Sequence, residues 1–291
     1  MNSKSNFEKE LNFKFMMIVS DSEIAKYISK FPDISLFVDL EILGKEERQG
    51  HLDTVKSSLN IDDVIRIRRA APNANILVRL NPLNDNSQYE IDLAINNGAD
   101  SIMIPMFHSL DDVNNFMKII NGRVKAVPLF ETIDSIKALP EIISKIPLEQ
   151  IHIGLNDLHL EQKKDFLFEP LSDGFLEEAC DALRSSDVKF GIGGIARAGE
   201  GLLSPEYILG EHVRLGSSVA ILSRAFHKDA KSLEELTCSI DFDRELNKLK
   251  YIYTNFQASS SIQLERNRDI TWKLIKKIAK KIKNDKNNKL E

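Results

Sequence analysis

Two short apolar runs of this chain each lead into a carboxylate. The first, Val127–Thr132, carries Glu131, and the second, Ile151–Leu158, carries Asp157. Both runs read as buried parallel strands, and an acid at the carboxyl end of such a strand is costly unless it binds a cation or takes part in chemistry. Two acids on successive strands suit one hard divalent metal ion, completed by water and substrate oxygens. The simpler alternative is that each acid caps the helix that follows it.

The ends of the second and third predicted strands add further polar groups. Asp39 and Glu41 share one face by the two-residue period of a strand, as do Arg79 and Asn81. An arginine fork beside a metal suits a carboxylate. A 2-oxo acid could then chelate Mg²⁺ or Mn²⁺ through its carboxylate and keto oxygens, so that the metal stabilises an enolate. Alternatively, Arg79 forms a structural ion pair with Asp39 or Glu41.

Glycines and a serine mark the expected ends of the seventh and eighth strands. Gly193, Gly194 and Ser217 lie in segments that often hold phosphate in barrels through backbone N–H groups. They could hold a phosphate or a second carboxylate of the substrate. The glycines could equally serve close packing of a strand against a helix.

The composition is that of an ordinary soluble protein, with 42% hydrophobic and 29% charged residues in a chain of 291. No apolar run approaches the roughly 20 residues of a membrane span. Residues Met1–Lys14 lack the apolar core of a signal peptide. Cys180 and Cys238 support neither a disulfide framework nor a cysteine-based metal site. These features predict a cytoplasmic protein with no membrane span.

The charge is unevenly distributed. Residues 241–291 hold 13 Lys and Arg against 7 Asp and Glu, a net charge of +6, whereas the preceding residues carry −11. The basic stretch Lys273–Lys289 could touch nucleic acid or acidic lipid. Such a stretch is more commonly the solvated face of an amphipathic helix, so we expect no nucleic-acid partner.

Eight nearly continuous apolar runs read as strands buried on both faces. The expected strands are 13–20, 35–41, 75–81, 101–106, 124–131, 150–157, 189–195 and 212–221. Amphipathic segments with capping residues or glycine stops separate most of them. The expected helices are 61–70, 87–96, 109–120, 133–143, 173–184 and 204–209. This alternation predicts a (β/α)8 TIM barrel, with a doubly wound sheet as the alternative.

Beyond the barrel, apolar residues at helical spacing predict two more helices, 241–256 and 260–284. Such an extension covers either its own barrel or a neighbouring copy, which favours a homo-oligomer, a trimer or hexamer, built through these helices. The final Leu290-Glu291 is typical of a cloning-site remnant. The chain thus divides into a polar N-terminal segment 1–12, a barrel 13–240, a helical extension 241–285 and a tail 286–291.

Five sequence features, taken in order over residues 13–226, resemble those of the HpcH/HpaI aldolase and citrate lyase β-subunit family. They are Phe37–Glu41 followed by Lys45 and Arg48, Val78–Pro82, Gly98–Asp100 before Ile104-Pro105, Phe130–Thr132, and Gly154–Leu158. The resemblance implies a metal-dependent lyase on a barrel like that of pyruvate kinase. It also implies that Glu131 and Asp157 bind the metal and that Arg79 holds the substrate carboxylate. Glu41 would orient the substrate or handle a proton.

The chain departs from the aldolases of this family at the catalytic base. Those enzymes carry a histidine shortly after the second strand, whereas here the first histidine is His51, ten residues after Glu41. His51 is therefore the candidate base, unless it is an ordinary surface histidine in a polar loop. The stretches Gly50–Thr54 and Gly191–Leu203 resemble a distinct subgroup associated with bacterial surface-polysaccharide pathways.

We therefore expect a class II, metal-dependent carbon–carbon lyase or aldolase acting on a 2-oxo acid such as pyruvate or oxaloacetate. A CoA thioester could be the partner substrate, although no segment requires one. One alternative is an enzyme for phosphoenolpyruvate or a phospho-sugar, with phosphate held by Gly193, Gly194 and Ser217. The other is a barrel that binds a metabolite or a protein without turnover.

Overall fold

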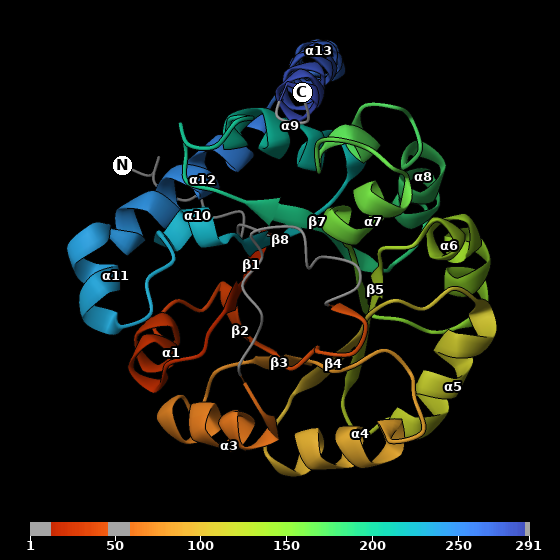
Figure 1. The fold of residues 1–291 in the computed structure, drawn as a ribbon, viewed down its shortest axis with the longest axis vertical. Helices are drawn as coiled ribbons and strands as arrows, with labels where there is room; N and C mark the ends of the chain where they lie inside the picture. The colour runs from red at the N-terminus through yellow and green to blue at the C-terminus, as the bar shows by residue number, and fades with distance from the viewer. Residues whose placement is uncertain (1–12, 46–58, 289–291) are drawn as a thin grey trace, which may run out of the picture.

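The structure, a computed structural model, describes residues 13–45 and 59–288. Its parallel strands close into a barrel in sequence order, with β1 paired to β8, and helices surround the barrel (Figure 1). The predicted (β/α)8 TIM barrel is confirmed. The strands are β1 (Lys14–Ile18), β2 (Ile34–Asp39), β3 (Ile76–Arg79), β4 (Ser101–Ile104), β5 (Lys125–Phe130), β6 (Gln150–Ile153), β7 (Lys189–Ile195) and β8 (Val219–Leu222).

Most barrel strands are followed by a helix that packs on the outside of the barrel. The predicted helices 61–70 and 87–96 are confirmed at both ends, whereas α1, α7, α10 and α11 have no counterpart in the prediction. The helices up to residue 240 are α1 (Ser22–Ile28), α3 (Ile61–Ala70), α4 (Ser87–Asn96), α5 (Leu110–Ile120), α6 (Ile133–Lys145), α7 (Leu155–Glu161), the 3₁₀ turn η1 (Glu169–Leu171), α8 (Glu177–Arg184), α9 (Pro205–Leu215), α10 (Arg224–His227) and α11 (Leu233–Ser239).

Side chains alternate along each strand between the barrel interior and the layer under the helices. A larger cluster of buried apolar residues joins the outer face of the strands to the helices. A smaller cluster of buried apolar residues lies inside the barrel and supports the side chains at the strand ends. Its members are Met16, Phe37, Leu77, Met103, Val127, Leu129 and Val219.

The predicted strand 212–221 begins too early, because residues 212–215 belong to a helix and the strand covers 219–222. Helix α9 runs to Leu215, and Gly216 ends it with a left-handed φ of 85°. Only then does β8 begin, at Val219. The spacing of the apolar residues in this stretch fits both a helix and a strand. The residues at the two ends indicate a helix, because Pro205 suits a first helical turn and Gly216 a helix end.

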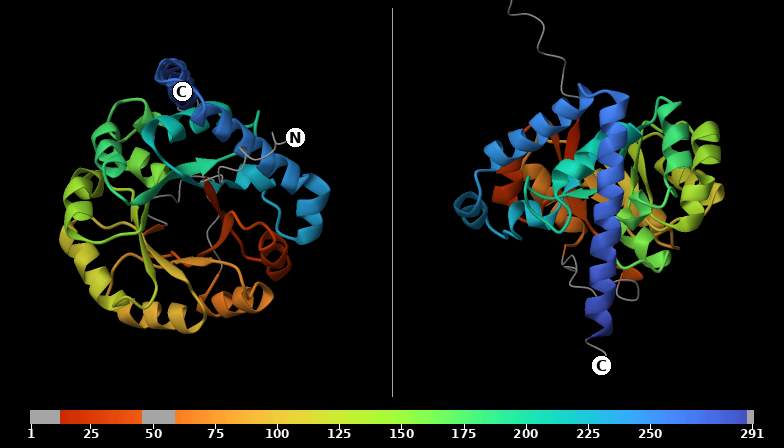
Figure 2. Two further views of the ribbon diagram at one scale, coloured as in Figure 1. Left: turned by 180° about the vertical axis from the view of Figure 1, so that it is seen from behind. Right: turned by 90° about the horizontal axis from the view of Figure 1, so that it is seen from above.

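The two predicted C-terminal helices are observed as α12 (Phe242–Gln257) and α13 (Ser261–Asn287). Both pack on their own barrel. On α12, the Tyr253 ring lies 4.1 Å from the Phe13 ring, and its hydroxyl donates to the Ser217 carbonyl. Helix α13 runs along α9 and extends beyond the barrel (Figure 2). The helices meet closely at Gly210, where a Cβ would lie 2.2 Å from the Asn267 amide.

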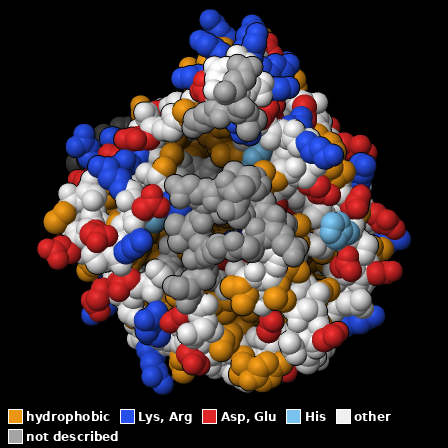
Figure 3. Space-filling model, viewed as in Figure 1, with side chains coloured by type: hydrophobic (Ala, Val, Ile, Leu, Met, Phe, Trp, Pro, Cys, Tyr) orange, Lys and Arg blue, Asp and Glu red, His pale blue; other side chains and the backbone are white. Residues whose placement is uncertain are grey.

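The basic stretch lies on the outer face of α13. Figure 3 shows Lys and Arg side chains gathered at the top of the view, where α13 lies, as a solvated helix face requires. Within the described parts of the chain, no helix is both long and apolar enough to cross a membrane.

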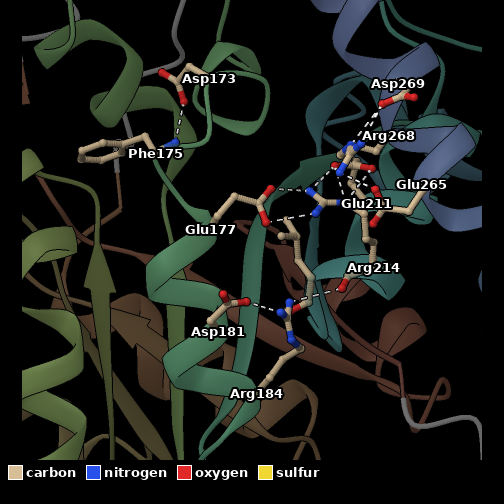
Figure 4. Close-up of polar contacts among 11 residues, drawn as sticks. Asp173, Phe175, Glu177, Asp181, Arg184, Glu211, Arg214, Glu265, Arg268 and Asp269 are labelled. Atoms are coloured by element: carbon tan, nitrogen blue, oxygen red, sulfur yellow. Dashed lines mark hydrogen bonds and ion pairs between the residues drawn. The ribbon is translucent and has the colours of Figure 1, made fainter. Parts of the chain in front are cut away.

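A buried ion cluster joins α8 to α9 beside α13 (Figure 4). The Arg214 guanidinium donates to both oxygens of Glu177, at 2.7 and 3.0 Å, and to Glu211 at 2.8 Å. The Glu211 side chain is only 1% exposed, and burial raises its pKa while Arg214 opposes that rise. Arg268 on α13 adds a further favourable charge. The cluster therefore depends on Arg214.

We predict that Arg214→Met lowers the free energy of unfolding by about 3 kcal/mol, because Glu211 and Glu177 lose their partner. The double variant Arg214→Met/Glu211→Leu should recover most of this loss, since the buried charge is gone. Urea unfolding measures both. The control Lys145→Met, in the exposed pair with Glu141, should change stability by less than about 0.5 kcal/mol. An Arg214→Met protein as stable as the wild type would contradict the assignment.

Candidate active site

The carboxyl ends of β2, β3, β5 and β6 bring five of the predicted site residues together. Asp39 and Arg79 end β2 and β3 and face each other in the sheet register. Glu131 directly follows β5, and Asp157 lies in the first turn of α7, just beyond β6. With Glu41, these make four carboxylates that are each at most 6% exposed. The mouth of the barrel therefore holds a dense set of buried charges.

Glu131 and Asp157 are close enough to repel each other. Burial raises the pKa of Glu131 well above its ordinary value, and the Asp157 carboxylate raises it further. The Arg79 guanidinium opposes this rise. A cation held by both carboxylates would remove the repulsion, because it would compensate both charges.

Backbone geometry fixes the Glu131 carboxylate. The Met106 N–H donates to Glu131 Oε1 with an N···O distance of 3.2 Å. Met106 has a φ of 54°, a left-handed conformation that is strained for a residue with a Cβ. Gly154 lies against the same side chain, and a Cβ there would be 2.9 Å from both the Cβ and Oε2 of Glu131. Sequence analysis missed both contacts, since strain and close approach exist only in the folded chain.

Neither metal-ligand candidate is a helix cap. Thr132 caps α6, and Gly154 precedes α7, of which Asp157 is the third residue. The predicted strand 150–157 therefore ends four residues early, and the capping alternative is wrong for both acids. At its far end α7 is tied to α6, because Glu161 Oε2 accepts the Ile133 N–H at 2.7 Å. This bond links the two segments that carry the acids.

Arg79 is held by an ion pair that the sequence left as an alternative. Its Nε and Nη2 donate to the two oxygens of Asp39 at 2.9 and 2.8 Å, and Glu41 Oε2 lies 3.5 Å from Nη2. Burial alone would lower the pKa of Arg79, but Asp39, Glu41 and Glu131 hold it above its ordinary value. Among these contacts, Nη1 is the nitrogen that stays available for a substrate oxygen.

Lys45 joins the same cluster. Its Nζ lies 2.9 Å from Asp39 Oδ2 and 3.8 Å from Glu41 Oε2. Burial would raise the pKa of Asp39, but Arg79 and Lys45 hold it well below its usual range. The cluster therefore contains two carboxylates, Asp39 and Glu41, and two cations, Arg79 and Lys45. Asp39 and Glu41 are thus the acids that pair with Arg79 and Lys45.

Asn81 has a supporting place beside the cluster. Its Oδ1 accepts the N–H groups of Ile42 and Leu43 at 2.9 and 3.0 Å, and its Nδ2 donates to Glu90 at 3.1 Å. These bonds fix the segment that follows Glu41. The predicted contact of Asn81 with substrate stays a prediction.

The glycines and the serine do not form one group. Gly193 and Gly194 lie near the carboxyl end of β7, and a Cβ on Gly193 would meet Leu155 at 2.8 Å. Ser217 precedes β8 and is hydrogen-bonded to His212 Nδ1 at 2.8 Å. Its predicted place in the substrate site is wrong, because it lies at the amino end of the barrel. His51 and Arg48 lie outside the described residues, so their roles stay predictions.

The acids fit a hard divalent cation. Both donors are buried carboxylates with oxygen-only chemistry, and their mutual repulsion calls for a positive charge. Within residues 13–45 and 59–288, no group of three or more His, Cys, Asp or Glu side chains could hold a metal. Glu131 and Asp157 would therefore supply two ligands, leaving other positions for water and substrate.

Comparison with solved structures finds the same fold in proteins named as aldolase, citrate lyase and citrate synthase. A HpcH/HpaI aldolase/citrate lyase family protein from Burkholderia cenocepacia matches with a TM-score of 0.54 and 14% identity, over 72% of this chain and 88% of that one. A citrate lyase from Burkholderia xenovorans matches with a TM-score of 0.57 and 9% identity, over 84% and 89%. Citrate synthase SbnG matches with a TM-score of 0.54 and 13% identity, over 82% and 96%.

No family model and no curated protein matches the sequence. At these identities the likeness is one of fold. The fold implied by the family resemblance is thereby confirmed, and the chain is built like the HpcH/HpaI aldolase and citrate lyase proteins.

We predict that Gly154→Ala weakens divalent-cation binding by about tenfold or more, because the new methyl group displaces Glu131. The φ of −89° at Gly154 suits alanine, so the backbone itself should tolerate the change. Calorimetric titration with Mn²⁺ measures the affinity. Gly194→Ala, whose Cβ would meet its nearest atom at 3.5 Å, is the matched control. Unchanged Mn²⁺ affinity in Gly154→Ala would show that Glu131 does not bind the cation from this position.

Two buried histidines predict an acid-sensitive fold. Burial lowers the pKa of His152 to about 4 and that of His212 to about 3. The unfolded chain binds these protons near pH 6.5, so stability is full above that pH and falls as the pH drops towards 4. Each histidine contributes up to about 1 kcal/mol per pH unit.

Urea unfolding between pH 5 and pH 7 should therefore show a flatter pH dependence in His152→Asn than in the wild type. The exposed His108→Asn should follow the wild type. An undiminished slope in His152→Asn would contradict the prediction.

Proposed function

We propose that this protein is a divalent-metal-dependent carbon–carbon lyase or aldolase that acts on a 2-oxo acid. The observation that carries the proposal is the pair of buried, neighbouring carboxylates of Glu131 and Asp157 beside Arg79. The fold supports it, since similar structures are named as aldolase, citrate lyase and citrate synthase. These names all describe the making or breaking of carbon–carbon bonds.

Each side chain has a distinct task in this proposal. Glu131 and Asp157 hold Mg²⁺ or Mn²⁺, which supplies Lewis-acid stabilisation of an enolate when bound. Arg79 offers Nη1 to the substrate carboxylate, while Asp39 keeps the guanidinium in place. Buried walls exclude water from the charged groups.

Forming the enolate removes a proton from the substrate carbon next to the keto group, so a proton acceptor must lie close to that carbon. Glu41 is 1% exposed and lies 3.5 Å from Arg79 Nη2, so it is placed beside a carboxylate bound there. We assign Glu41 to orient the substrate or accept its proton, with His51 as the other candidate base. We propose pyruvate or oxaloacetate as the substrate. A CoA thioester is a candidate for the second substrate. The proposed pathway is surface-polysaccharide metabolism.

The phosphate-based alternative, as predicted with Ser217, is not supported by the structure. Ser217 lies before β8, away from the acids at the barrel mouth. A barrel that binds its ligand without turnover would lack the pyruvate exchange that is predicted below.

We predict that the protein, with Mg²⁺ or Mn²⁺ added, exchanges the methyl hydrogens of pyruvate in deuterated water. Exchange should fall by about 100-fold or more in Glu131→Gln and in Asp157→Asn, because these amides keep the shape but lose the charge that holds the cation. Proton NMR of pyruvate follows the reaction.

The exposed Glu149→Gln is the matched control and should exchange as the wild type does. Chelation of the metal should stop exchange in both proteins. An exchange rate that is unchanged by the chelator and by both site variants would contradict the proposal.

A further inference from the structure

Three unsatisfied polar atoms belong to the segments that follow β7 and β8. Arg197 Nε, Ser223 Oγ and His227 Nδ1 are buried and find no hydrogen-bond partner in the part of the chain that the structure describes. Arg197 follows β7, Ser223 follows β8, and His227 ends α10. Buried polar groups without partners are rare, and each costs free energy unless something binds it.

The backbone brings these residues into one corner. The Ser223 N–H donates to the carbonyl of Ile195, the last residue of β7, at 2.9 Å, and Arg197 comes two residues later. Ser223 and His227 are one helical turn apart across α10. Figure 1 shows α10 beside the end of β7.

Ser223 lies on the inner face of the barrel. A Cβ added to Gly194 would lie 3.7 Å from the Cβ of Ser223, so the two positions share one face of the sheet. Gly194 pairs with Ile221, which packs against the cluster inside the barrel. The hydroxyl therefore belongs to the same mouth that holds Glu131 and Asp157.

The chemistry of this corner suits an anion. Arg197 is 8% exposed, and its ion pair is with Glu200, at 3.1 Å, whose side chain is 54% exposed and therefore screened by water. Burial lowers the pKa of His227, and its neutral ring can still donate a hydrogen bond. A buried guanidinium, a hydroxyl and an imidazole together match the oxygens of a phosphate or carboxylate group.

We propose that Arg197, Ser223 and His227 form a second anion-binding subsite, which holds a phosphate or carboxylate group carried by a substrate. The subsite deepens the proposed function, and its link to turnover rests on that function. It limits the substrates to those with a second anionic group, either a dicarboxylic 2-oxo acid or a phosphorylated partner. Its residues differ from the predicted set with Ser217.

Anion titration tests the subsite without any turnover. Inorganic phosphate and succinate are titrated calorimetrically into the full chain without added metal. We expect one of them to bind, and Arg197→Met to weaken that binding by about tenfold or more. Ser223→Ala should weaken it by about threefold. Arg224→Met, which removes an exposed neighbouring charge, should stay within about twofold of the wild type.

The preferred anion identifies the ligand. Tighter phosphate binding favours a phosphorylated substrate, and tighter succinate binding favours a diacid. Failure of both anions to bind the wild type, or equal binding by Arg197→Met, would overturn the subsite. If Arg197→Met does not fold, Ser223→Ala decides, since its hydroxyl has no partner in the described fold and its removal should not reduce stability.

A different experiment tests the proposed function. That function would be contradicted if the protein did not catalyse metal-dependent hydrogen exchange in pyruvate, whatever the anion titration shows. Pyruvate carries one carboxylate, so the exchange reports on Glu131 and Asp157, whereas the titration reports on Arg197. The two proposals are therefore separable.

Discussion

Repulsion between two buried carboxylates governs the mouth of this barrel. Glu131 and Asp157 share a low-dielectric space in which their charges raise the free energy of the protein. The chain nevertheless holds them there, through the strained Met106 backbone, the missing side chain of Gly154 and the tie from Glu161 to α6. Buried acids whose pKa is perturbed in this way are typical of functional sites.

The neighbouring ion cluster fixes the positions of Arg79 and Lys45. Arg79 is close enough to influence Glu131, yet its Nε and Nη2 are committed to Asp39. Lys45 completes the balance on the Asp39 side. Since Arg79 and Lys45 are both bound to Asp39, their charges are fixed beside the carboxylate pair. Preorganised charge of this kind needs little rearrangement when a ligand arrives.

The sequence predicted those features that depend on local pattern. Continuous apolar runs predicted the barrel, and acids at strand ends predicted where Glu131 and Asp157 would meet. The stretch before β8 was misassigned, because its apolar residues fit a helix and a strand equally, and the helix signals of Pro205 and Gly216 decide between them. Ser217 was therefore placed at the wrong end. The strain at Met106 and the corner around Arg197 depend on contacts between distant segments, which no spacing in the sequence records.

Closure of the barrel has a consequence for biosynthesis. The seam joins β1 to β8, so the edge of the first strand stays unpaired until some two hundred further residues have left the ribosome. An open, apolar edge is a site for aggregation while translation continues. Helix α12 then covers this seam from outside, with Tyr253 against Phe13. A helix that follows the barrel in the chain thus shields the strand with which the barrel begins.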